Sequence, residues 1–218
     1  MSLIAKASGT DVEPIPAGMH PAVCYGVIDL GTQPAFGQFP AKRKVLFLFE
    51  LPEERADFER DGKKVNMPRA VSASFTLSLH KKSTLRPVLE GWRGREFTAV
   101  ELEGFDVQAV CGANALLNIT HRAGSGKHAD RTFADVKAIC PLPKGTAKRT
   151  AENQLVKFTL GDTPLGTAPS NTASLPDWIW GRIMQSEEYM ALTVAPTQPQ
   201  PTEAEMANVS GDEENVPF

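Results

Sequence analysis

The chain has 218 residues, of which 41% are hydrophobic and 22% charged, with 17 glycines and 17 prolines. This composition is that of an ordinary globular protein of one or two domains, and it excludes collagen-like, coiled-coil and wholly disordered chains. The longest apolar runs, such as residues 45–49, are far shorter than the roughly 20 residues of a membrane-spanning helix. The first residues lack the basic and apolar segments of an export signal, so we expect a cytoplasmic protein.

The charge is unevenly distributed along the chain. The net charge is −3, from 23 basic and 26 acidic side chains. Residues 194–218 contain five of the acids and no Lys or Arg, so the rest of the chain holds 23 basic and 21 acidic side chains, or +2. This asymmetry predicts an acidic tail attached to a mildly basic body.

The first part of the body is predicted to consist of three strands. Apolar and other side chains alternate over residues 20–30 and 44–51. The alternation is most regular over residues 71–79, where odd positions are apolar and even positions are Ser or Thr. Such alternation is typical of antiparallel strands with one buried face. We expect Phe47, Phe49, Phe75 and Trp92 to be core residues.

A helical connection and two more strands are predicted next. Ser83 or Thr84 can cap a helix that carries Leu85, Leu89 and Trp92, and a second short helix is predicted over residues 102–110. Two strand-like runs, residues 114–122 and 131–140, follow and are joined by a hairpin loop. This order is that of the OB-fold, a five-stranded Greek-key barrel that binds oligonucleotides. The predicted fold class is therefore mainly β, an OB-fold barrel with a helical connection between strands three and four.

The C-terminal part is predicted to contain one helix and a disordered tail. Apolar side chains recur at helical spacing over residues 176–190, with Pro176 in the first turn. A Gly, Pro, Ser and Thr-rich stretch precedes this helix, and a Pro, Gln and Thr spacer follows it. The expected domains are a nucleic-acid-binding domain over 1–160, a connector and docking helix over 161–193, and a disordered acidic tail over 194–218.

The cysteines and histidines show no metal-ligand pattern. Cys24, Cys111 and Cys140 are widely spaced without a C-x-x-C pair, and the four histidines form only one His-x6-His pair. We predict buried free thiols, and no metal or other cofactor.

The sequence ends with acidic residues followed by Val-Pro-Phe. A partner pocket can bury the Phe218 ring while basic groups bind the terminal carboxylate and the acids. A merely solubilising tail is the alternative, but it does not account for an aromatic residue after proline. The predicted partner-binding residues are Asp212, Glu213, Glu214, Val216, Pro217 and Phe218.

This ending resembles the tip of bacterial single-stranded DNA-binding proteins, in which acids precede a terminal Pro-Phe. Four stretches of the body, residues 15–18, 81–85, 105–112 and 138–145, are similar to phage-encoded single-stranded DNA-binding proteins with an OB core. The resemblance implies that the chain coats and protects single-stranded DNA during phage DNA replication or recombination in the infected bacterium. It also implies that the tip recruits replication or recombination proteins.

A site for single strands needs cations for the phosphates and aromatic rings for the bases. Phe36 and Phe39 lie in a Gly and Pro-containing loop just before three consecutive basic residues, and stacking or local packing is open for both. Tyr25 and Phe133 can point to either face of their strands, and the last hairpin sets Phe133 near Arg122. The predicted single-stranded DNA-binding residues are Tyr25, Phe36, Phe39, Lys42, Arg43, Lys44, Arg69, Lys81, Lys82, Arg122, Lys127, Phe133 and Lys137.

Two other classes of function are alternatives to binding. Glu50, Glu101, Glu103 and Asp106 offer carboxylates for a metal-dependent nuclease, but they form no recognisable motif and fit surface and helix-end positions equally well. A virion-associated structural protein with an OB-like barrel would explain the strands but not the terminal Pro-Phe. The sequence thus favours a binding protein that is not an enzyme, and a homo-oligomer is left open.

Overall fold

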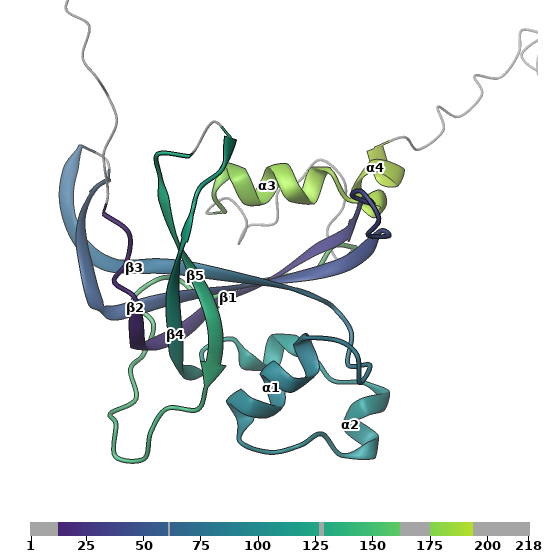
Figure 1. Cartoon of the computed structure of the whole chain (residues 1–218), viewed down its shortest axis with the longest axis horizontal. Coiled ribbons are helices and arrows are strands. Elements are labelled where there is room, and N and C mark those ends of the chain that lie inside the picture. The colour runs from purple at the N-terminus through teal and green to yellow at the C-terminus, as the bar shows by residue number, and fades with distance from the viewer. Residues whose placement is uncertain (1–12, 61, 127–128, 162–174, 194–218) are drawn as a thin grey trace, which may run out of the picture.

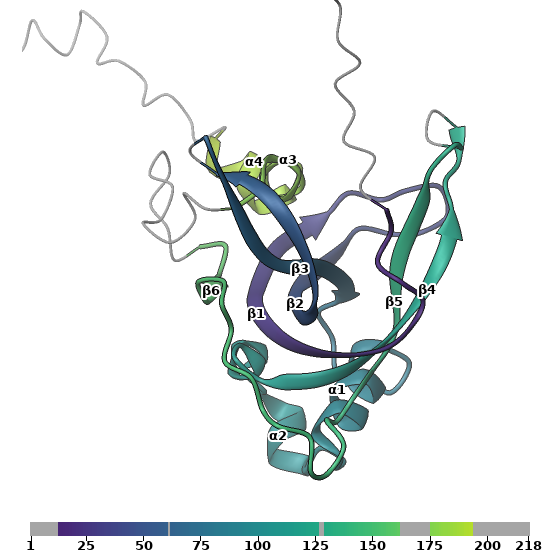
Figure 2. The same ribbon diagram turned by 90° about the vertical axis from the view of Figure 1, so that its left-hand side faces the viewer.

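The computed structural model describes residues 13–60, 62–126, 129–161 and 175–193 (Figure 1). The body is mainly β, which confirms the predicted class. One antiparallel sheet has the strand order β3-β2-β1-β4-β5 and curls until its two outer strands, β3 and β5, come into contact (Figure 2). The five strands are β1 (Gly18–Gln33), β2 (Lys42–Arg60), β3 (Lys63–Thr76), β4 (Asn114–Ala123) and β5 (Thr132–Cys140).

Strands β2 and β3 are longer than the sequence predicted. Beyond a register shift between Leu51 and Arg55, the two strands continue as a paired ribbon up to Arg60 and Lys63. Side-chain hydrogen bonds from Arg55 Nε to Asn66 Oδ1 (2.7 Å) and from Asn66 Nδ2 to Asp57 Oδ1 (2.9 Å) hold this ribbon together. Polar side chains thus stabilise the extension without a buried apolar face.

The main core fills the inside of the curl. Odd-numbered side chains of β2, including Phe47 and Phe49, pack there against Trp92 of α1 (Leu85–Arg93). The Phe49 and Trp92 ring centroids lie 5.5 Å apart, and Phe47 is 5.6 Å from Phe75. Trp92 Nε1 donates to the Asn114 carbonyl at 2.8 Å, so the one polar atom of the ring is satisfied. The predicted core aromatics are confirmed.

The connection between β3 and β4 contains two further short elements in place of the single helix predicted over residues 102–110. Helix α2 (Ala99–Glu103) ends at Gly104, which is extended, and the 3₁₀ helix η1 (Val107–Val110) then starts after Asp106. Asp106 accepts a hydrogen bond from the Gln108 amide at 2.8 Å. A new N-cap so soon after a glycine breaks the helix, and this is why the prediction was wrong.

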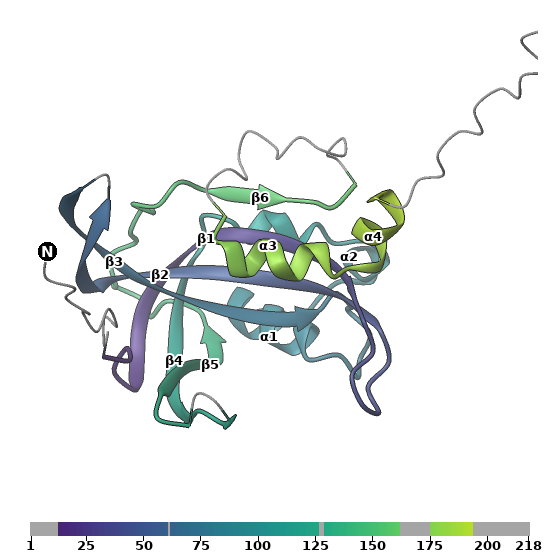
Figure 3. The ribbon, with the colours of Figure 1, turned by 90° about the horizontal axis from the view of Figure 1, so that it is seen from above.

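A second apolar cluster covers the outer face of β1 and β2. Even-numbered residues such as Ile28 and Leu46 pack there against β6 (Val156–Phe158), which pairs in parallel with β1, and against α3 (Asp177–Met184). Figure 3 shows α3 and β6 lying along this part of the sheet. The single docking helix of the prediction is two helices, α3 and α4 (Glu187–Thr193).

Ser186 marks the break between α3 and α4. Its hydroxyl donates to the Ile183 carbonyl at 2.7 Å and accepts from the Tyr189 amide at 3.2 Å. Such local bonds of a serine side chain cap the second helix. No helix in the described part of the chain is long and apolar enough to cross a membrane.

All three cysteines are free thiols, as predicted. Cys24 on β1 is fully buried, whereas Cys111 and Cys140 are half-buried. Burial, together with the nearby Cys111, raises the pKa of the Cys24 thiol, so Cys24 stays protonated. The predicted tail, residues 194–218, lies outside the described residues.

Candidate nucleic-acid interface

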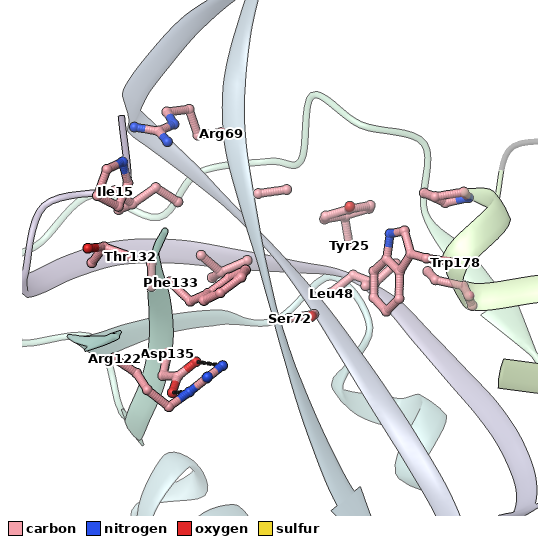
Figure 4. A pocket seen from close by; sticks show the side chains of 16 residues that line it. Ile15, Tyr25, Leu48, Arg69, Ser72, Arg122, Thr132, Phe133, Asp135 and Trp178 are labelled. Atoms are coloured by element: carbon pink, nitrogen blue, oxygen red, sulfur yellow. Dashed lines mark hydrogen bonds and ion pairs between the residues drawn. The ribbon is translucent and has the colours of Figure 1, made fainter. Parts of the chain in front are cut away.

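A groove of about 520 Å³ lies where β3 and β5 meet, next to the start of α3 (Figure 4). Three aromatic side chains line it, Tyr25 from β1, Phe133 from β5 and Trp178 from α3. Arg69 of β3 and Arg122 of β4 also line it. In Figure 4, Tyr25 and Trp178 lie toward one end, and Phe133 and the two arginines toward the other. Segments far apart in the sequence thus bring aromatic and cationic groups together.

Tyr25 reaches the groove from the outer face of β1. The side chain is half-buried against the second apolar cluster. Burial, with a smaller contribution from the nearby Glu50 carboxylate, raises the pKa of Tyr25 to about 12. The phenol is therefore neutral at physiological pH and can present both a ring and a hydroxyl.

Trp178 reaches the groove because of the way in which α3 packs. Ile179 and Ile183, four residues apart, point into the second apolar cluster and are fully buried. Trp178 therefore lies beside the buried face of the helix, and half of its surface (50%) is exposed. An exposed tryptophan on a well-anchored helix is a ready stacking surface.

Phe133 and Arg122 are directly opposite each other on β5 and β4. The Arg122 guanidinium carbon lies 5.1 Å from the Phe133 ring centroid, as the sequence predicted for this pair. Arg122 Nε also bonds Asp135 Oδ2 at 2.7 Å, which offsets part of its charge. Arg69 donates to a backbone carbonyl, that of Glu13, and no carboxylate of the described residues pairs with it.

A second group of predicted residues lies on the β1–β2 hairpin. Phe36 and Phe39 exchange two backbone hydrogen bonds, Phe36 N to Phe39 O at 2.9 Å and Phe39 N to Phe36 O at 3.0 Å. Gly37 provides the left-handed conformation of the tight turn between them, with φ +57°. The side chains are 83% and 64% exposed. The exposure speaks against local packing of the two rings, and stacking on bases stays a prediction.

Basic residues gather at the base of this hairpin. Lys42, Arg43 and Lys82 line one pocket of about 500 Å³. Arg43 is already paired, because its Nη2 bonds Asp29 Oδ2 at 2.5 Å and its Nε bonds Asp29 Oδ1 at 3.2 Å. The two lysines of the pocket, Lys42 and Lys82, are exposed. Lys42 and Lys82 are therefore the cations that this pocket offers to a ligand.

The other predicted site residues lie in neither place. Lys44 is half-buried on β2, and Lys81 and Lys137 are exposed but line neither the groove nor the hairpin pocket. Lys127 lies outside the described residues, as do all six predicted partner-binding residues from Asp212 to Phe218.

Three of the four carboxylates considered for a nuclease, Glu50, Glu101 and Asp106, have structural partners. Glu50 is fully buried, and its oxygens accept from the Glu152 amide at 2.7 Å and from the Asn153 amide at 2.9 Å. Glu101 forms a capping box with Thr98 and accepts from Arg95 Nη2 at 2.8 Å. Within residues 13–60, 62–126, 129–161 and 175–193, no cluster of three or more His, Cys, Asp or Glu is placed to hold a metal.

Trp178 is the aromatic groove residue that the sequence did not predict. The apolar spacing of residues 176–190 indicates a docking helix, and the spacing of Ile179 and Ile183 within it places Trp178 off the buried face. Comparison of the chain with protein-family models, with curated proteins and with solved structures gave no match.

Proposed function

We propose that this chain binds single-stranded DNA without strong sequence preference and protects it during phage DNA replication or recombination. The observation that carries the proposal is the groove, in which Tyr25, Phe133 and Trp178 converge with Arg69 and Arg122. Rings stack on any unpaired base, and arginines bind the phosphates that every nucleotide carries. This combination favours nucleic acid over other ligands and is indifferent to sequence.

Single strands fit this arrangement better than a duplex. The faces of paired bases are covered by their neighbours in the helix, so rings that line a groove cannot reach them. The described groove offers two arginines, one of which is partly neutralised by Asp135. Stacking therefore has to supply a large share of the binding free energy.

The barrel is proposed to be an OB-fold. The strand order β3-β2-β1-β4-β5, the contact between β3 and β5 and the position of α1 between β3 and β4 support this assignment. In this fold, the second and third strands and their loops bind oligonucleotides. Both the groove, which β3 lines, and the β1–β2 hairpin agree with that location.

Recruitment of replication or recombination proteins is proposed for residues 212–218, and it rests on the sequence. Three acids and the Val-Pro-Phe run supply charge and an apolar anchor for a partner pocket. Deletion of residues 212–218 should abolish capture of such partners from a bacterial lysate while strand binding persists. Retained capture would contradict this part of the proposal.

The test of strand binding is a fluorescence-anisotropy titration with a single-stranded oligonucleotide and its duplex at several salt concentrations. We expect tighter binding to the single strand and an affinity that falls as salt rises, because bound phosphates release counterions. Equal affinity for the duplex would contradict the proposal. The absence of binding would favour the structural protein, and shortening of the oligonucleotide with a divalent cation would favour the nuclease.

A further inference from the structure

The hairpin pocket lies at the junction of the start of β2, the end of β3 and the loop before α1. Lys42, His80, Lys82, Ser78 and Ser83 are among its lining residues, and no carboxylate is. We propose that this pocket is a specific binding site for a phosphate group. The proposal adds to the strand-binding groove a separate anion site, with its own hydrogen-bond donors.

The side chains of the β3–α1 loop are arranged so that their donors remain available. Ser78 Oγ accepts from the His80 amide at 3.2 Å, and Ser83 Oγ accepts from the Leu85 amide at 3.2 Å. His80 Nδ1 accepts from the Lys82 amide at 3.2 Å, which assigns the proton of a neutral ring to Nε2. The acceptor atom of each of these side chains thus pairs with a backbone amide. Each side chain keeps an O–H or N–H that can donate to a ligand. A phosphate, which only accepts at its ionised oxygens, matches a pocket of donors.

The two lysines supply the charge. Neither Lys42 nor Lys82 has an ion-pair partner in the described part of the chain. Arg43 is bonded to Asp29, and its backbone carbonyl accepts from the Leu77 amide at 2.9 Å. Arg43 therefore fixes the wall of the pocket while the two lysines remain available to an anion.

Strand β3 connects this pocket with the groove. Its residues Ala70 and Ser72 line the groove, and Thr76, followed by Ser78, lines the pocket. Between them Ser74 is exposed, and its hydroxyl accepts a hydrogen bond from Arg182 Nη2 of α3 at 3.3 Å. At about 3.3 Å per residue, Ser72 and Thr76, both on β3, are roughly 13 Å apart along the strand. One strand of several nucleotides can therefore occupy both places, and this step rests on the proposed function.

The test compares two double variants in binding to oligothymidylates of about 4 and about 16 nucleotides, the range of site sizes for one barrel. The first is Lys42→Ala with Lys82→Ala. The matched control is Lys63→Ala with Lys64→Ala, which removes the same charge from exposed positions that line neither the groove nor the pocket. Anisotropy is measured from low to high salt for each protein.

We expect the first double variant to weaken binding of the long oligonucleotide on the order of tenfold at 0.1 M salt. Its salt slope should fall by about 1.4, since each single-strand phosphate contact contributes about 0.7. The short oligonucleotide, held in the groove, should bind with nearly unchanged affinity to both variants. If the control variant loses as much affinity as the first, the loss comes from the lower net charge of the protein, and the pocket is not a phosphate site.

A second measurement tests the pocket independently of strand binding in the groove. Inorganic phosphate is titrated into the full chain while the backbone amide signals of His80, Lys82 and Ser83 are followed by NMR. Saturable shifts that the first double variant abolishes and the control retains support the pocket, even if no oligonucleotide binds and the proposed function fails. The proposed phosphate site would be overturned if phosphate shifted none of these amide signals in the intact chain, or shifted them equally in both variants. Phosphate shifts without the length-dependent loss would identify free phosphate, and not the strand, as the ligand.

Discussion

Glu188 of α4 holds Thr32 at the end of β1 with both carboxylate oxygens. Oε1 accepts from Thr32 Oγ1 at 2.6 Å, and Oε2 accepts from the Thr32 amide at 2.6 Å. The neighbouring Gly31 has a φ of +67°, and a Cβ there would lie 2.6 Å from Ser186 Cβ and 2.8 Å from Glu188 Oε2. The helix pair thus docks on a point of β1 where a side chain has no room.

Gly31→Ala is therefore expected to destabilise the chain more than Gly37→Ala. Both glycines have a positive φ, but a Cβ at Gly37 meets nothing within 4 Å. We expect Gly37→Ala to cost about 1 kcal/mol of unfolding free energy through backbone strain alone. Gly31→Ala should cost about 1–3 kcal/mol more through overpacking. Urea unfolding measures both, and equal losses would contradict the packing described here.

Acid should weaken the connection between β3 and β4. Hydrogen bonds from Arg95, then from the Thr98 amide and from Arg93, lower the pKa of Glu101 to about 2 from an ordinary value of 4.5. Because the folded-state pKa is the lower one, this stabilisation is fully present above about pH 4.5 and is lost as the pH falls toward 2. Unfolding in urea at a series of pH values should show the loss. Glu101→Gln should show a shallower dependence over the same interval, and an unchanged one would contradict the assignment.

The two phenylalanines of the β1–β2 hairpin should contribute to binding and little to stability. Among the residues that the structure describes, they are the two most exposed aromatic side chains, at 83% and 64%. Phe36→Ala with Phe39→Ala should weaken single-strand binding while the salt slope is nearly unchanged, because no phosphate contact is lost. Phe58→Ala, at an exposed site on the β2–β3 ribbon, is the control. If the hairpin variant binds as well as the control, the hairpin is not part of the interface.

Trp178 should be a stacking residue of the groove. Trp178→Ala is expected to reduce single-strand affinity by about 1–3 kcal/mol, the usual contribution of one stacked base. Met184→Ala, another half-exposed apolar position on α3, should leave affinity unchanged and controls for damage to the helix. Anisotropy measures both, and a neutral Trp178→Ala would remove α3 from the proposed interface.

The strands that the sequence predicted are those with one buried face. Residues 71–79 alternate clearly because Val71, Ala73 and Phe75 turn to the core while Ser72 and Ser74 turn to solvent. The ribbon of β2 and β3 beyond Leu51 has no such face, so it leaves no hydrophobic period to read. Strand β6, with three residues, is too short to show one.

The candidate site was predictable as a list of residue types and not as an arrangement. The sequence predicts Tyr25 and Phe133 as site residues, but their convergence depends on the contact between β3 and β5, which no local pattern encodes. It also predicts Arg43 as a DNA-binding cation, although the pairing of Arg43 with Asp29 depends on the register of β1 against β2. Long-range register decides which charges are already paired, and it lies beyond the local periodicity of a sequence.

Cys24 provides the chain with an internal reporter of barrel opening. Its sulfur is fully buried between strands and donates weakly to the Gly26 carbonyl at 3.6 Å, and burial raises the pKa of the thiol. An alkylating reagent needs an exposed thiolate, so in a chain with Cys111→Ser and Cys140→Ser the reagent must wait until β1 separates from its neighbours. The labelling rate of one sulfur then measures how often the sheet opens, and a bound strand that clamps β3 against β5 would slow that rate.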